Sequence, residues 1–295
     1  MSNPLPSHPS DFVSSLSLKP EERSEAENRW VALQPYLLSK GYQLRPRYRP
    51  DWVPSWKATG TNPRNCEDST NSLPLRVLDA TSVNDQRQVV IKMIVPSRGD
   101  REGEEELEVL QLFSSSPYCD DPRNHAVPCL DSFPIPDVEG GMFLVMPLLS
   151  AYAYPEFYNL DELHDFLEQI FEGLEYLHEN EIAHCDIAPA NIMMDKHPLY
   201  DEPFHPVHQQ YTPDIKRRVS PKRNRSQKPV RYYYIDFGYA KWFQNPTHAR
   251  LVIGIHAREA APEQQSGPYN PFKADVYQLG ALLRRDLIPV RWLFT

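Results

Sequence analysis

The chain has 295 residues, of which 40% are hydrophobic and 24% charged, as in an ordinary folded globular protein. Its formal net charge of −9 argues against a general nucleic-acid-binding protein, so we expect no specific nucleic-acid partner. No stretch approaches the roughly 18 apolar residues of a membrane span, so we expect no membrane partner. The polar start of the chain lacks the regions of a secretory signal, and the four cysteines show no C-x-x-C spacing. These features predict an intracellular protein, cytoplasmic or nuclear, with reduced thiols.

The first sixty residues are predicted to contain a disordered start, a helix and an arm. Residues 1–17 are expected to be disordered. A helix is expected to open at Lys19, because Pro20 and the acidic residues after it suit a first turn, and to end at Gly41. The apolar stripe of this helix would be formed by Trp30, Leu33, Leu37 and Leu38. Residues 45–56 are predicted to form an extended basic arm, and its packing side chains would be Tyr48, Trp52 and Trp56.

The remaining elements are predicted from hydrophobic periodicity, with period 2 for strands and 3.6 for helices. In chain order they are strands over 75–81 and 88–95, a helix over 104–113, a strand over 142–146, a helix over 160–179, a strand over 231–236 and a helix over 272–286. A β-rich part is thus followed by a helical part, which predicts two lobes.

Four short motifs carry the chemistry of the chain. The first is V-V-I-K at residues 89–92, where a lysine ends an apolar run and would need an anionic partner if buried. The second is H-C-D-I-A-P-A-N at residues 184–191, directly after the long helix. The third is I-D-F-G at residues 235–238, and the fourth is A-P-E at residues 261–263, followed by Asp275. In this order they resemble the protein-kinase signature set of strand lysine, H-R-D-x-x-x-x-N, D-F-G and A-P-E.

The resemblance covers about residues 75–286 and implies an α+β fold of the two-lobed, protein-kinase-like type. More loosely, the chain resembles a kinase-like group of mushroom-forming fungi. The implied domains are an N-terminal segment over 1–60, a small β-rich N-lobe over 61–149, and a mainly helical, partial C-lobe over 150–295 with a basic insertion at about 198–230. The C-lobe would be incomplete, because the chain ends soon after the helix that carries Asp275.

The resemblance implies a nucleotide site for ATP. Lys92 would hold the α and β phosphates and pair with Glu106, although Glu106 could instead lie on a solvated helix face beside Glu105. The hinge would run from Met146 to Leu149, and the Leu149 N–H would bind adenine. Lys92 could alternatively be a strand-edge lysine with its ammonium in water.

The resemblance also implies a metal site and a catalytic carboxylate. Asn191 and Asp236 would hold Mg²⁺, which prefers oxygen ligands. Asp186 would orient the hydroxyl of a protein substrate and accept its proton. His184 and Asp275 are expected to be structural, bonding the backbone around the catalytic loop.

Several positions depart from the kinase pattern. The glycines of the phosphate-covering loop would fall at Thr70, Ser72 and Leu75, and a loop without glycine approaches phosphates less closely. The arginine of H-R-D is replaced by Cys185. The cation that would neutralise the transferring phosphoryl group is missing both at Ala188 and at Ala190, where serine/threonine and tyrosine kinases respectively carry it.

The stretch between Asn191 and Asp236 contains a cluster of basic residues with no acidic residue between Ile215 and Arg231. The simpler interpretation is a mobile, solvated loop that buries too little to order itself. The alternative is a nuclear-import or anion-binding patch, with Ser220 before a proline as a phosphorylation site.

Three functions stay open at this point. The first is a protein phosphotransferase that uses ATP and Mg²⁺, with weak activity. The second is a pseudokinase that binds nucleotide or a protein partner, and the third is a small-molecule kinase, which A-P-E and Asp275 argue against. The early end of the chain further predicts a marginally stable protein or an incomplete gene product, whose last helix turns apolar side chains toward water, namely Val276, Leu279, Leu282 and Leu283. The alternative is that the N-terminal arm, with Trp30, Trp52 and Trp56, covers part of this face.

Overall fold

The computed structural model describes residues 19–70, 75–96, 103, 105–245, 249–254, 257–265 and 267–287. They fall into two compact units. The first unit combines the chain up to Lys92 with Glu202–Ser220, and the second combines Met93–Asp201 with the chain from Pro221 onward. These units are defined by contacts within the chain and are not the predicted lobes. The lobe boundaries inferred from the sequence therefore stay predictions. The segment expected to be disordered, residues 1–17, lies outside the described residues.

The first helix of the first unit, α1 (Glu25–Ser39), begins later than predicted. Ser24 accepts a hydrogen bond from the Glu27 N–H, and the Glu27 carboxylate accepts one from the Ser24 N–H, at 3.2 and 2.8 Å. This reciprocal capping box fixes the start of the helix, so the predicted start at Lys19 is wrong. Trp30 is buried as predicted, but Leu38 is 46% exposed and does not belong to the buried stripe.

Residues 45–70 fold around a buried ion pair, so the prediction of an extended arm is wrong. Arg47, in the 3₁₀ turn η2 (Pro46–Tyr48), pairs with Glu27 of α1, and both side chains are buried. A buried pair survives only with further hydrogen bonds, and Arg47 also donates to the carbonyls of Pro20 and Glu22 at 2.7 Å each. A short helix follows, α2 (Ser55–Thr59). The expected packing of Tyr48 and Trp56 is confirmed, since both are buried.

Three antiparallel strands follow or flank this part: β1 (Tyr42–Gln43), β2 (Val77–Ser82) and β3 (Gln88–Ile94). β1 pairs with β2, and β2 pairs with β3 in a register that sets Val77 opposite Lys92. The two strands predicted over 75–81 and 88–95 are therefore confirmed. Val89 and Ile91 are buried and alternate with half-buried neighbours, which is the period-2 pattern of a strand with one covered face.

The basic segment that was expected to be mobile is divided between the two units, and each part is packed within its own unit. Phe204 and His205 are buried, and the Phe204 carbonyl accepts a hydrogen bond from the Gln88 side chain of β3 at 2.9 Å. Further along, Arg225 is buried in the second unit. The prediction that the segment buries too little to order itself is wrong, because a few apolar side chains and one arginine anchor it. Its exposed arginines pair locally, as Arg217 does with Glu202 at 2.5 Å.

The second unit contains the remaining strands and helices. In chain order they are α3 (Glu106–Phe113), β4 (Asp131–Pro134), β5 (Met142–Pro147), β6 (Ser150–Ala151), α4 (Leu160–Glu179), β7 (Ile182–Ala183), β8 (Ile192–Asp195), β9 (Arg231–Tyr234), β10 (Lys241–Trp242) and α5 (Pro271–Asp286). β4 pairs with β5, β6–β8–β9 form a small antiparallel sheet, and β10 pairs with β7. Each helix and strand predicted here is confirmed, with bounds shifted by two residues at most.

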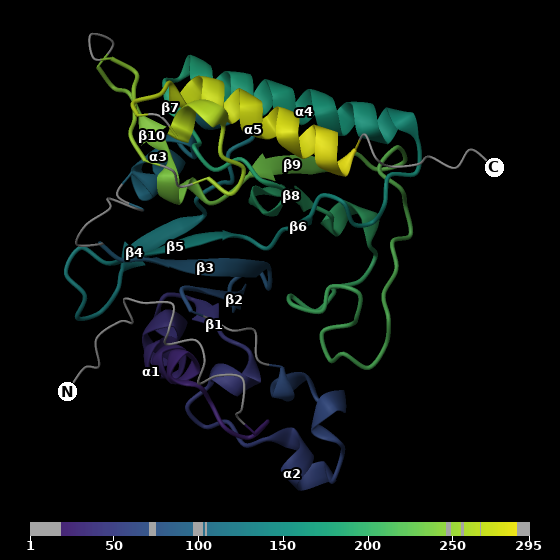
Figure 1. The fold of residues 1–295 in the computed structure, drawn as a ribbon. Helices are drawn as coiled ribbons and strands as arrows, with labels where there is room; N and C mark the ends of the chain where they lie inside the picture. Colours follow the sequence, from purple (N-terminus) through teal and green to yellow (C-terminus); the bar gives the residue numbers. More distant parts are fainter. Residues whose placement is uncertain are drawn as a thin grey trace. The chain divides into compact units, whose positions relative to one another are not determined.

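α4 packs along β9 through the face that its sequence period predicts (Figure 1). Phe166, Ile170 and Leu177 are buried on this face. Gly173 sits where the helix passes closest to the segment before β4, because a Cβ at that position would lie 2.6 Å from the Cβ of His125. Only glycine permits this close approach.

α5 is more deeply packed than predicted. Leu279 and Leu282 are buried, so the prediction that they face water is wrong, and Leu283 is half-buried. Val276 is 60% exposed, as predicted. The covered face of α5 meets β7 and the loop that follows it, which explains the burial.

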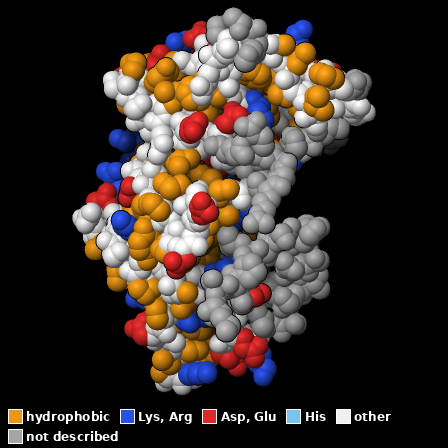
Figure 2. Space-filling model, turned by 90° about the vertical axis from the view of Figure 1, so that its left-hand side faces the viewer, with side chains coloured by type: hydrophobic (Ala, Val, Ile, Leu, Met, Phe, Trp, Pro, Cys, Tyr) orange, Lys and Arg blue, Asp and Glu red, His pale blue; other side chains and the backbone are white. Residues whose placement is uncertain are grey.

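The surface and the cysteines agree with the composition. All four cysteines, Cys66, Cys119, Cys129 and Cys185, are free thiols, as predicted. Among the described helices, none has the length and apolarity required to cross a membrane. On the face seen in Figure 2, Lys and Arg side chains are interspersed with Asp and Glu, so its visible described atoms form no large patch of one charge.

Candidate active site

The loop between β7 and β8 carries Asp186, and α5 holds its first half. The fully buried Asp275 accepts the N–H of His184 and the N–H of Cys185, at 2.8 Å each. Its third contact is with His178 Nε2 of α4, at 3.0 Å. Cys185 has a positive φ of 67°, which is strained for a residue with a side chain. Asp275 therefore stabilises a turn that the backbone alone would not favour, and the predicted structural role of Asp275 is confirmed.

Gln278, one turn further along α5, holds the second half of this loop, and the sequence interpretation missed it. Its Oε1 accepts the N–H of Ile187 at 2.8 Å, and its Nε2 donates to the carbonyl of Cys185 at 3.4 Å. The side chain is fully buried. The available signal was its spacing, because a polar residue three positions after Asp275 lies on the same helix face. Gln278 thus fixes the peptide units on both sides of Asp186.

Asp186 lies at the centre of this framework and is only 4% exposed. The Asn191 side-chain amide donates to the Asp186 carbonyl at 2.8 Å and to its Oδ2 at 2.9 Å. The other carboxylate oxygen, Oδ1, accepts the backbone N–H of Arg258 at 3.0 Å. The segment just before A-P-E therefore lies directly on the carboxylate.

His184 connects the catalytic loop to the D-F-G segment. Its Nε2 lies 3.0 Å from the Ile235 carbonyl, and its Nδ1 accepts the Asp186 N–H at 3.3 Å. Because Nδ1 itself accepts a hydrogen bond and Nε2 faces a carbonyl oxygen, the ring carries its proton on Nε2. The ring also packs against Phe237 of η8 (Phe237–Tyr239), with ring centroids 4.8 Å apart. The predicted structural role of His184 is confirmed.

Asp236 and Asn191 are brought together by the backbone. The Ile235 N–H donates to the Asn191 carbonyl at 2.9 Å, so the residue before Asp236 is bound directly to Asn191. Asp236 is half-buried and adopts the left-handed conformation, with φ 62° and ψ 67°, at the sharp turn into η8. Non-glycine residues held in this region cost energy and cluster at functional sites.

The donor set at this turn fits Mg²⁺. Asn191 uses its amide nitrogen for Asp186, which leaves its Oδ1 for a cation, and Asp236 supplies a carboxylate. No cluster of three or more His, Cys, Asp or Glu able to hold a metal occurs in the described part of the chain. That is expected for Mg²⁺, which is often held by one or two protein oxygens together with substrate phosphates.

The two glutamates at the start of α3 have different environments. Glu106 is buried, whereas Glu105 is half-buried and accepts the Trp242 N–H of β10 at 2.6 Å. Lys241 Nζ lies 3.9 Å from the other Glu105 oxygen. The solvated-face alternative for Glu106 is therefore wrong, because this side chain is only 2% exposed.

The remaining predicted nucleotide residues lie on strands or directly beside one. Met146 is near the end of β5, and the buried Leu149 comes directly before β6, whose Ser150 pairs with Met194 of β8. The hinge candidates thus lead into the sheet whose strand β8 directly follows the loop that carries Asp186. Lys92 is the last residue of the first unit. It lies on β3 and is half-buried there. The second unit therefore brings together Asp186, Asn191 and Asp236.

The positions that depart from the pattern lie in contrasting environments. Burial, together with the nearby Asp275 carboxylate, raises the pKa of the Cys185 thiol well above its usual value, so this side chain is neutral. Ala188 is buried, whereas Ala190 is exposed. Of the expected glycine positions, Thr70 and Leu75 are described, and Ser72 lies outside the described residues.

The sequence matches the protein kinase domain family over residues 76–288, which includes Asp186, Asn191, Asp236 and Asp275. The chain belongs to the protein kinase family. Its kinase domain has the two-lobed α+β fold of that family. Residues 19–70, here called the N-terminal module, precede the matched region.

Curated relatives of this kinase domain include three protein kinases. They are the serine/threonine-protein kinase Doa of Drosophila melanogaster, 25% identical over 180 residues, or 59% of this chain and 19% of that protein; PknF of Mycobacterium tuberculosis, 30% identical over 131 residues, or 43% and 21%; and the Wee1-like protein kinase of Drosophila melanogaster, 29% identical over 123 residues, or 41% and 20%. The matched stretch thus spans about a fifth of each relative's length.

Proposed function

We propose that the chain is an ATP-dependent protein kinase that transfers the γ-phosphoryl group to a protein hydroxyl, slowly and with Mg²⁺. The observation that carries the proposal is the joint fixation of Asp186, Asn191 and the Asp236 turn by hydrogen bonds from three separate parts of the second unit. The four free thiols of the protein support a reducing, intracellular location in the cytoplasm or nucleus.

Asp186 would act on the acceptor. A carboxylate within hydrogen-bond reach of the substrate hydroxyl orients it and accepts its proton as the new bond to phosphorus forms. The Asn191 amide supports this role, because it donates to Asp186 Oδ2 at 2.9 Å and limits rotation of the carboxylate. The acceptor hydroxyl would share Oδ1 with the Arg258 N–H, or replace it there.

Four residues would bind the nucleotide. Lys92 would pair with Glu106 and bind the phosphates, and the hinge residues Met146 and Leu149 would bind adenine. Asn191 and Asp236 would hold Mg²⁺ together with the phosphates. The metal, when bound, neutralises charge on the transferring group. The burial of Glu106 supports this arrangement, because a buried carboxylate favours a cationic partner.

The groups that would stabilise charge on the transferring phosphoryl group are incomplete, which supports a low rate of transfer. A second candidate function therefore stays open, a pseudokinase that binds nucleotide or a protein partner. Neither Ala188 nor Ala190 can supply a cation, and losing one such donor typically costs about 10²–10³ in rate. Asp186 is also only 4% exposed beneath Arg258. Both observations favour slow transfer or none.

Turnover of ATP with a mixture of protein substrates separates the two candidates. A kinase would show Mg²⁺-dependent phosphate incorporation well below the roughly 1–100 s⁻¹ of ordinary kinases, and Asp186→Asn would abolish it. Ala190→Arg should raise the rate, because position 190 is exposed and accommodates the longer side chain without overpacking. Incorporation that is absent from both the wild-type chain and Ala190→Arg, with nucleotide binding intact, would favour the pseudokinase.

A further inference from the structure

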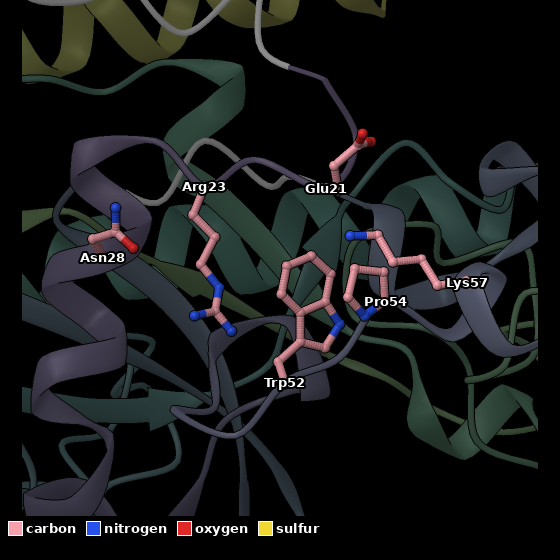
Figure 3. A pocket seen from close by; sticks show the side chains of 6 residues that line it. All are labelled: Glu21, Arg23, Asn28, Trp52, Pro54 and Lys57. Atoms are coloured by element: carbon pink, nitrogen blue, oxygen red, sulfur yellow. The ribbon is translucent and has the colours of Figure 1, made fainter.

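The N-terminal module contains a pocket outside the region that matches the kinase family, which begins at residue 76. The pocket has a volume of about 310 Å³ and is lined by Glu21, Arg23, Asn28, Trp52, Pro54 and Lys57 (Figure 3). Its lining comes from the turn before α1, from α1 itself, from the stretch that leads into α2 and from α2. Phosphoryl transfer uses none of these residues.

One side of the pocket is held rigidly. Arg23 donates through Nε to the Arg47 carbonyl at 2.8 Å and through Nη2 to the Arg49 carbonyl at 2.7 Å. Its guanidinium lies over the Trp52 ring, 4.7 Å from the centroid. Trp52 in turn donates through Nε1 to Asp68 at 2.8 Å. A ligand would therefore meet side chains that are already ordered, which lowers the entropic cost of binding.

Donors in this pocket have unused hydrogen-bonding capacity. Within the described residues, Arg23 Nη1 has no hydrogen-bond partner, and neither the Asn28 side-chain amide nor the Lys57 ammonium has a hydrogen bond or an ion pair. In Figure 3 the Arg23 and Lys57 side chains flank the Trp52 ring from opposite sides. A group that accepts several hydrogen bonds could thus be bound across this ring.

The charges lining the pocket favour an anion of low charge. Arg23 and Lys57 are opposed by a single carboxylate, Glu21. Burial and the neighbouring Arg47 charge lower the pKa of Arg23, which means that the local environment disfavours its positive charge. A bound anion would relieve this, whereas Glu21 would disfavour a doubly charged group.

We infer that this pocket binds an acidic peptide, with one carboxylate side chain accepting a hydrogen bond from Lys57 on one side of the Trp52 ring and a peptide carbonyl accepting one from Arg23 Nη1 on the other. The Asn28 amide is available for the peptide backbone, and the Trp52 and Pro54 rings offer apolar contact for the adjoining methylene groups. The volume suits one side chain with its backbone, and the module gives the kinase domain a recognition site separate from phosphoryl transfer.

The test uses the full chain and two capped tripeptides, acetyl-Gly-Asp-Gly-amide and acetyl-Gly-Asn-Gly-amide. Binding is followed by the ¹H–¹⁵N resonance of the Trp52 indole, assigned with Trp52→Phe. We expect a saturable shift with the Asp peptide alone. Lys57→Gln should weaken binding about 3- to 10-fold, because it removes one charge-assisted hydrogen bond. Glu21→Gln should tighten it about 2- to 5-fold, because it removes a nearby like charge.

Lys228→Gln is the matched control, since it changes the charge equally at an exposed lysine of the second unit and should leave binding unchanged. Equal shifts with the Asp and Asn peptides, or equal affinities of Lys57→Gln and Lys228→Gln, would overturn the inference. Tighter binding of the corresponding phosphoserine peptide than of the Asp peptide would overturn the selectivity assigned to Glu21. None of these readouts requires ATP, so a failure here is distinct from a failure of the proposed kinase activity.

Discussion

Two polar side chains of one helix determine the conformation of the loop around Asp186. Asp275 accepts the N–H groups of His184 and Cys185, and Gln278 binds the peptide units on either side of Asp186. Each side chain accepts a hydrogen bond from a buried backbone N–H that would otherwise have no partner. Such a bond stabilises the fold more than an ordinary exposed hydrogen bond does. The geometry of the carboxylate therefore depends on α5 as much as on the loop itself.

Replacing Gln278 tests this dependence. In Gln278→Met the side chain keeps its length but loses both hydrogen bonds, which leaves the buried Ile187 N–H unsatisfied. We expect the free energy of unfolding, measured by urea titration, to fall by about 1–3 kcal/mol. Val276→Met is the matched control, because Val276 lies two positions away on the exposed face. A loss that is the same in both variants would show that Gln278 does not hold the loop.

His125 gives a pH-dependent prediction at the same scale. Burial lowers its pKa to about 4, and its Nδ1 lies 2.7 Å from the Tyr232 carbonyl, so the folded protein keeps the imidazole neutral. Arg231 adds a further positive charge nearby that disfavours protonation. In the unfolded chain a histidine has a pKa of about 6.5. The unfolded state therefore binds more protons between these values, and stability is present above pH 6.5 and lost as the pH falls toward 4.

His125 should lower the free energy of unfolding by about 2 kcal/mol between pH 7.5 and pH 5. Urea titrations at the two pH values measure this difference, and it should be smaller by that amount in His125→Asn. His164→Asn, at an exposed histidine, should leave the difference unchanged. Parallel pH dependence of wild type and His125→Asn would contradict the assignment.

At the scale of elements, the hydrophobic period predicted the parts of the chain whose structure is decided locally. The bounds of α4 match the prediction because its apolar residues recur on one face over twenty residues. The 45–56 stretch was misassigned because its fold depends on the ion pair of Arg47 with Glu27 of α1, a contact between residues distant in sequence. The basic segment was misassigned for the same reason, since composition alone does not show where Arg225 finds its partners.

Arg225 anchors the basic segment to the second unit. It donates to the Tyr232 hydroxyl at 2.7 Å, to the Tyr152 carbonyl at 2.8 Å and to the Pro155 carbonyl, and its guanidinium lies 4.1 Å from the Phe157 ring centroid. Arg225→Met should therefore lower the free energy of unfolding by about 2–4 kcal/mol, because it leaves buried acceptors without a donor.

Lys228→Met is the matched substitution in the same segment and should change stability by less than about 0.5 kcal/mol, since Lys228 is exposed. Limited proteolysis gives an independent measurement, with faster cleavage of residues 216–228 expected only in Arg225→Met. Rapid cleavage of this stretch in the wild-type chain would restore the mobile-loop interpretation.

At the scale of the whole molecule, the order of the motifs predicted the family and the fold, because each motif marks a specific strand end or turn. The packing around the site was less predictable. Nothing in the sequence indicates that Arg258 would donate its N–H to Asp186, since that contact depends on how the segment before A-P-E returns to the loop. The N-terminal module likewise has no motif, and its pocket is formed by side chains from three separate segments.

The most direct test of the proposed kinase function is calorimetric titration of ATP into the full chain, with Mg²⁺ and with a chelator. We expect saturable binding that requires Mg²⁺, that is lost in Asp236→Ala and weakened in Lys92→Ala, and that persists in Asp186→Ala, because Asp186 acts on the acceptor and not on the nucleotide. Thermal unfolding of each variant serves as the control for folding. Binding that Asp236→Ala leaves unchanged, or that Asp186→Ala abolishes as fully, would contradict these roles.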